Sequence, residues 1–244
     1  MKIEAVLFDA GGTLIHVDGR RFCAAAGLPC LPEAFAAAEA AATGAVRSWI
    51  LRHPVSTDAE RMPVFLDRLL LALGMDVQQE REAAARRIAQ EHARANLWSD
   101  AFPGARETLG ALRERGYRLG VISNADGRVR RLLEEAGLAT HLEIILDSAH
   151  VGLEKPDPRI FLAAAGGLQL LPSSCAFVGD VYEIDILGAR AAGLRAILIG
   201  ASPAPDPVER VETLRGLLEL FPAITPQEEV SGFRFQDRGR PPEN

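Results

Sequence analysis

Short runs of consecutive apolar residues alternate with longer amphipathic segments along most of the chain. The short runs are apolar almost throughout, as expected of strands that are buried on both faces of a sheet. They cover residues 3–8, 119–122, 144–146, 176–178 and 196–199. The segments between them have the apolar spacing of helices, and they cover residues 105–115, 127–136, 158–165, 185–192 and 207–220. This alternation predicts an α/β fold with a doubly wound parallel sheet.

A long insertion separates the first predicted strand from the second. Most of it has helical apolar spacing and is rich in Ala, Arg and Leu, in segments 32–51, 59–73 and 79–96. A crossover between parallel strands does not need such length. We therefore predict an all-helical cap over residues 16–97, inserted into a Rossmann-like core of residues 1–15 and 98–225. The polar tail, residues 226–244, is expected to be loosely ordered.

The amino-acid composition limits the classes of molecule that the protein is expected to bind. The 244 residues carry a formal net charge of −6, which argues against a broad nucleic-acid or anionic-membrane surface. No apolar run approaches the ~18 residues of a membrane span. The three cysteines fit no zinc pattern and suggest free thiols in a reducing cytoplasm. A small anionic substrate stays compatible with this charge, and nothing requires more than a monomer or a homodimer.

Polar residues that can carry chemistry stand where the predicted strands end. Asp9 ends the first strand, Ser123 the second and Asp180 the fourth, and Lys155 lies in the loop after the third. Ligands of an open α/β sheet bind outside the carboxyl ends of its strands. We therefore expect these four side chains to meet at one edge of the sheet.

The chemistry that suits this set is phosphoryl transfer. Asp9 and Asp180 can hold Mg²⁺ through oxygen, and Asp185 can support the metal or its waters. Asp9 can attack phosphorus to form an aspartyl-phosphate that water then cleaves. Lys155 and the hydroxyl of Ser123 would bind the phosphoryl oxygens. The sequence thus predicts a magnesium-dependent phosphatase of a small phosphorylated metabolite.

Each of these residues, taken alone, also has a purely structural explanation. An aspartate at a strand end often forms a turn or caps a helix, and Ser123-Asn124 can cap the helix that follows. Gly11-Gly12 can be a tight turn, and it does not complete a dinucleotide-binding pattern. The functional interpretation depends on the whole ordered set.

That set resembles the haloacid dehalogenase superfamily, in the subfamily I branch with a helical C1-type cap. Four segments in residues 1–222 carry the resemblance: Phe8–Leu14, Ser123-Asn124, Lys155–Pro158, and Gly179 through Ala189. It implies that Asp9 is the nucleophile and a catalytic residue together with Lys155. It implies a metal site formed by Asp9, the Gly11 carbonyl, Asp180 and Asp185. It implies phosphate binding by Gly12, Ser123, Asn124 and Lys155.

One position departs from the pattern that the resemblance implies. Phosphatases of this superfamily usually carry a second aspartate two residues after the nucleophile, where this chain has Gly11. Loss of a positioned general acid/base costs about 10²–10⁴ in rate. Either turnover is slow, or leaving groups are good, or another group substitutes, with His16, Asp18 and His53 as candidates. The alternatives are a catalytically impaired, phosphate-binding regulatory protein, and phosphoryl transfer to an acceptor other than water.

Two other chemistries of the superfamily fit less well. Its dehalogenases usually have a tyrosine at the position of Gly11 and lack the acid that Asp180 provides here. Its phosphonoacetaldehyde hydrolases need a lysine in the cap, and this chain has lysine only at Lys2 and Lys155. In the cap, a cluster of Arg47, Trp49, Arg52 and His53 could form a pocket roof, although a solvated helix face is the favoured interpretation.

Overall fold

The computed structural model describes residues 2–224, and the expectation for the tail therefore lies outside the described residues. Six parallel strands form one sheet in the order β5-β4-β1-β6-β7-β8. Their bounds are β1 Ala5–Phe8, β4 Arg118–Ser123, β5 Ile144–Asp147, β6 Cys175–Gly179, β7 Arg195–Ile199 and β8 Glu209–Val211. The chain leaves β1 toward one edge and leaves β6 toward the other, so their shared carboxyl end is a topological switch point. The predicted parallel α/β class is confirmed.

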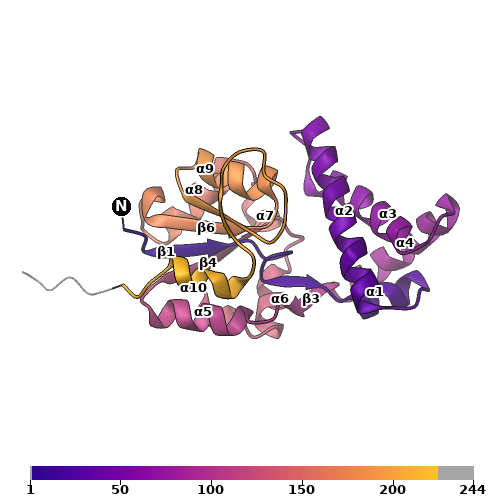
Figure 1. Cartoon of the computed structure of the whole chain (residues 1–244), viewed down its shortest axis with the longest axis horizontal. Helices are drawn as coiled ribbons and strands as arrows, with labels where there is room; N and C mark the ends of the chain where they lie inside the picture. Colours follow the sequence, from indigo (N-terminus) through magenta and orange to yellow (C-terminus); the bar gives the residue numbers. More distant parts are fainter. Residues whose placement is uncertain (1, 225–244) are drawn as a thin grey trace, which may run out of the picture.

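Helices cover both faces of this sheet (Figure 1). One face carries α5 (Ala105–Glu114), α6 (Val129–Glu135) and α10 (Leu217–Leu220), and the other carries α8 (Pro158–Gly167) and α9 (Leu187–Ala191). Side chains alternate between the faces, because successive residues of a strand point in opposite directions. In β1, Val6 and Phe8 enter the first apolar cluster, whereas Ala5 and Leu7 enter the second. A short helix, α7 (Ser148–Val151), follows β5.

Four helices lie beside the end of the sheet toward which β1 points (Figure 1). They are α1 (Gly19–Ala26), α2 (Pro32–Arg52), α3 (Asp58–Ala72) and α4 (Gln78–Arg94), and α1 was not expected from the sequence. They bury their own apolar cluster, which includes Phe22, Phe35, Leu69 and Ile88. An antiparallel ribbon of β2 (Ile15–Val17) and β3 (Trp98–Ala101) joins these helices to the sheet. We refer to α1–α4 as the cap.

The predicted helix over residues 207–220 is wrong for most of its length. Its first part forms β8, where Glu209–Val211 pairs with β7, and only Leu217–Leu220 is α-helical, after a 3-10 turn. The parallel sheet recruits this segment as an edge strand, overriding a weak local preference. The segment predicted as a helix over residues 185–192 begins with a π-helical turn, Tyr182–Ile186. None of the helices described in residues 2–224 combines the length and apolar character needed to cross a membrane.

Candidate active site

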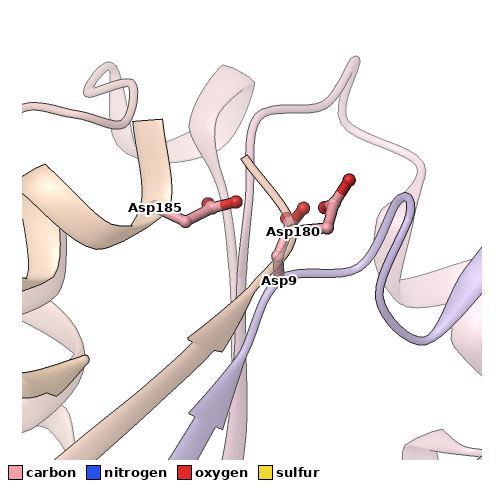
Figure 2. Close-up of side chains that lie close together, drawn as sticks. All are labelled: Asp9, Asp180 and Asp185. Carbon is pink, nitrogen blue, oxygen red and sulfur yellow. The ribbon is translucent and has the colours of Figure 1, made fainter. Parts of the chain in front are cut away.

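Three carboxylates converge beyond the ends of β1 and β6 (Figure 2). Asp9 follows β1 directly, Asp180 follows β6, and Asp185 lies in the π-helical turn that comes next. One oxygen of each lies within 4.8 Å of the others. The backbone N–H of Asp9 donates to the carbonyl of Val178 at 2.8 Å, which fixes the end of β1 against β6. Oxygen ligands in such a group are those that Mg²⁺ prefers.

Lys155 joins this cluster from the loop after β5. Its Nζ lies 2.6 Å from Asp9 Oδ1 and 2.7 Å from Asp185 Oδ1, and the side chain is only 2% exposed. Asn124 fixes the backbone that carries it: Asn124 Oδ1 accepts from the N–H of Lys155 at 2.8 Å, and its Nδ2 donates to the carbonyl of Lys155 at 3.0 Å. Asn124 therefore positions the backbone of Lys155, and one N–H of its amide group stays available to a ligand.

The loop that carries Asp180 and Asp185 is held by its own hydrogen bonds. The second carboxylate oxygen of Asp185 accepts from the backbone N–H of Val181 at 2.9 Å. A Cβ at Gly179 would lie 2.4 Å from the Asp185 carboxylate carbon, so a glycine is needed there. Thr13 donates its hydroxyl to Asp180 Oδ1 at 3.3 Å. Since Asp185 already bonds Lys155 and this loop, it orients the site as well as contributing a carboxylate to it.

Burial sets the electrostatics of the cluster. It raises the pKa of Asp9 to about 7, although Lys155 opposes the shift. Burial also raises the pKa of Asp180 well above its usual range, and the charges of Asp185 and Asp9 raise it further. For Lys155, burial would lower the pKa, but the two adjacent carboxylates outweigh it and raise the pKa. One lysine therefore faces three acids, and the donor set fits a divalent cation that would offset the remaining negative charge.

Gly11 and Gly12, the two glycines that closely follow Asp9, have different roles. Gly12 has φ +77°, and a Cβ there would lie 2.5 Å from Asp180 Oδ2. Its N–H donates to the carbonyl of Ile15 at 2.8 Å, so this amide is already used within the turn. A Cβ at Gly11 would instead lie 3.4 Å from Trp98 Cδ1 and 3.5 Å from its Nε1, in ordinary contact. The indole of Trp98 thus lies next to the point where a side chain at position 11 would begin.

A cavity of about 260 Å³ extends from the cluster to the cap. Its core side includes Asp9, Ser123, Lys155 and Asp180, and its cap side includes Glu39, Asp58, Arg61, His92 and Trp98. Within the described part of the chain, the suggested acids His16, Asp18 and His53 are not among the residues that line it. Asp18 caps α1, and His53 is exposed and stacks on Trp49 at 3.9 Å. Arg61, His92 and Trp98 were not predicted, because no local sequence pattern marks them as site residues.

Polar contacts hold the cap against the core around this cavity. Arg47 makes two hydrogen bonds to the carboxylate of Glu183, at 3.0 and 2.8 Å. The backbone N–H of Asp58 donates to Glu154 at 3.1 Å. His92 Nε2 lies 3.2 Å from Asp126 Oδ2. Of the residues suggested for a pocket roof, Arg47 therefore binds the core beside the site, and it does so through Glu183.

Comparison with known proteins gives consistent matches. The model of a family described as haloacid dehalogenase-like hydrolase matches residues 3–193. Human haloacid dehalogenase-like hydrolase domain-containing protein 3 is 32% identical over 92% of this chain and 94% of its own length. The bovine protein of that name is 37% identical, over 57% of each chain.

Two further matches extend this result. Phosphoserine phosphatase of Thermus thermophilus is 36% identical over 56% of each chain, so this match spans about half of that enzyme. A dehalogenase solved with an intermediate complex has the same fold, with a TM-score of 0.64, 24% identity, and coverage of 92% of this chain and 99% of that one. The matches thus include relatives named for different reactions.

Proposed function

Because the chain belongs to the haloacid dehalogenase-like hydrolases, we propose that it is a magnesium-dependent phosphatase of a small phosphorylated metabolite, with Asp9 as nucleophile. The observation that carries the proposal is the position of Asp9 at the switch point, against Lys155 and next to two further carboxylates. Relatives that include a phosphoserine phosphatase support a phosphoester substrate. A cavity of about 260 Å³ suits a small one.

The metal site would be formed by Asp9 and Asp180, with Asp185 beside them. When bound, Mg²⁺ would screen the charge of the incoming phosphate and of the carboxylates. Lys155 would contact the phosphoryl oxygens while it stays paired with Asp185, since an ammonium group has three donors. The hydroxyl of Ser123, at the end of β4 and on the cavity wall, would donate to a phosphoryl oxygen.

The reaction would proceed in two displacements. An oxygen of Asp9 attacks phosphorus, the bond from phosphorus to the leaving-group oxygen breaks, and that oxygen keeps the electron pair. Water then attacks the phosphorus of the aspartyl-phosphate, which releases inorganic phosphate and restores the Asp9 carboxylate. The proton that the water loses passes to the phosphate or to solvent.

The indole of Trp98 bears on which leaving groups can depart in the first displacement. An indole N–H donates a hydrogen bond, but it neither gives up its proton nor accepts one from water. It lies beside Gly11, where a carboxylic acid would otherwise protonate the leaving group. We therefore expect leaving groups that depart without a proton, such as those of acyl or aryl phosphates, to react much faster than alkyl ones.

The test is phosphate release from a panel of monoesters with and without magnesium. Asp9→Asn should abolish it, whereas Asp76→Asn, an exposed aspartate on the cap, should have no effect. A label transferred from substrate to the protein, stable in acid and released by hydroxylamine, would identify an acyl-phosphate. Full activity of Asp9→Asn would show that another residue is the nucleophile.

The second candidate is a protein that binds a phosphorylated ligand with little turnover. The position of Trp98 beside Gly11 favours it, because no carboxylic acid then stands two residues after Asp9 to assist either step. It predicts a phosphorylated Asp9 that persists after excess substrate is removed. Phosphate release in steady turnover, faster than decay of any labelled protein, would exclude it.

A further inference from the structure

The cap side of the cavity contains a buried arginine. Arg61 lies in the first turn of α3, lines the cavity and is only 3% exposed. Its Nε donates to the hydroxyl of Ser56 at 3.1 Å, and its Nη2 donates to the carbonyl of Ser56. Its Nη1 is buried and has no hydrogen-bond partner among residues 2–224. A buried charged donor without a partner is unfavourable, and more so than a neutral one.

No carboxylate of the described residues forms an ion pair with Arg61, in contrast to the other cations near the site. Lys155 is paired with Asp9 and Asp185, and Arg47 with Glu183. Burial lowers the pKa of Arg61, while Asp58 and Glu154 counteract this from a distance. The guanidinium therefore stays charged, and its Nη1 has no partner among residues 2–224 although the side chain lines the cavity.

We propose that Arg61 binds a carboxylate of the substrate, so that the protein acts on small phosphomonoesters that also carry a carboxylate. This rests on the proposed function, which places the phosphoryl group at Asp9. A guanidinium presents planar donors that match the two oxygens of a carboxylate. A single negative charge also balances a single guanidinium. A second phosphate would add more charge to a cavity that already contains Glu39 and Asp58.

The experiment compares 2-phosphoglycolate with its primary amide, which has the same size but no carboxylate. Wild-type protein should show a kcat/KM about 10- to 100-fold higher for the acid, the range expected of a hydrogen bond to a charged group. Arg61→Met should reduce that ratio to near one, mainly by lowering kcat/KM for the acid. Arg61→Lys keeps the positive charge but lacks the planar donors, so its acid-to-amide ratio should lie between those of wild type and Arg61→Met. Arg68→Met, an exposed arginine on the same helix, should leave the ratio unchanged.

Hydrolysis of the amide by Arg61→Met also reports that this variant folds. An equal acid-to-amide ratio in wild type and Arg61→Met would overturn the proposal, as would tighter binding of a bisphosphate than of the carboxylate ester. Titration of 2-phosphoglycolate and of its amide into Asp9→Asn tests the carboxylate site separately from the phosphatase function. If no monoester is hydrolysed but the titration shows an Arg61-dependent preference for the acid, the phosphatase proposal fails and the carboxylate site stands. If the titration shows no such preference for the acid, the carboxylate site is refuted, whether or not the protein hydrolyses monoesters.

Discussion

Replacement of Gly11 by aspartate would introduce a carboxylic acid two residues after Asp9, the proposed nucleophile. The backbone accepts the change, because Gly11 is not among the glycines with positive φ. The new Cβ would lie 3.4 Å from Trp98 Cδ1, which is an ordinary contact. Beyond the Cβ, the carboxyl group would lie close to the indole. We expect a folded protein in which the new acid reaches the leaving group in part of the population.

The gain should be at the low end of what an acid/base contributes. A positioned acid/base contributes about 10²–10⁴ in rate, or about 3–5 kcal/mol of transition-state stabilisation. Since Trp98 competes for the space, we expect Gly11→Asp to raise kcat for a poor leaving group by roughly 10²-fold. The gain should be much smaller for a good leaving group, because such a group needs little help from an acid.

Phenyl phosphate and p-nitrophenyl phosphate provide this comparison, because they share a ring but differ in leaving-group acidity. Wild-type protein should hydrolyse p-nitrophenyl phosphate far faster than phenyl phosphate. Gly11→Asp should reduce the ratio of these two rates by raising the rate for phenyl phosphate. Gly11→Asn is the matched control, since it fills the same space and transfers no proton. It should leave the ratio of the two rates as in wild type.

Two results would refute this reasoning. If Gly11→Asp folds and binds magnesium as wild type does, but the ratio is unchanged, then no missing acid limits the first displacement. If Gly11→Asn accelerates phenyl phosphate as much as Gly11→Asp, then the gain comes from filling space near Trp98 and not from proton transfer.

Three further substitutions probe the site. Gly12→Ala should destabilise the fold by about 1–2 kcal/mol, because its φ is +77°, and should weaken magnesium binding, because the new Cβ would displace Asp180; chemical denaturation and calorimetry measure these. Asp180→Asn should weaken magnesium binding at least tenfold by calorimetry. In EDTA it should unfold at a higher temperature than wild type, since burial raises the pKa of Asp180 and disfavours its charged form. Arg47→Met should leave the buried carboxylate of Glu183 unpaired and speed amide hydrogen exchange in the cap; unchanged exchange there would mean that this ion pair does not hold the cap closed.

The core half of the site could be predicted from sequence because the sheet determines it. Strands buried on both faces are nearly continuous in apolar residues, so their ends can be located to within a residue or two. Once the strands are parallel, the residue after each end must lie at the same edge, whatever the loops do. Asp9 and Asp180 were placed together on this basis, and the structure brings their carboxylates within 4.8 Å.

The cap half could not be predicted in the same way. The contact between Trp98 and Gly11 depends on pairing of β3 with β2, two short strands at opposite ends of the cap insertion. Arg61 reads in the sequence as one of many surface arginines, and its burial results from how α3 packs. The edge strand β8 has three residues, too few to show a period, and was mistaken for part of a helix.

In the proposed phosphatase, the junction between cap and core would therefore influence how the substrate reacts. Gly11 forms a β-bridge with Ile15, at the start of the ribbon that carries the cap, and Trp98 opens the returning strand of that ribbon. The ring of Trp98 also contacts the cap helices, with Phe65 at 5.9 Å and His92 at 5.7 Å between ring centroids. Any movement of the cap that shifts β3 must then change what lies beside the leaving group. The residues around Asp9 would bind the phosphoryl group in a fixed frame, whereas protonation of the leaving group and recognition of the rest of the substrate would both depend on how the cap closes.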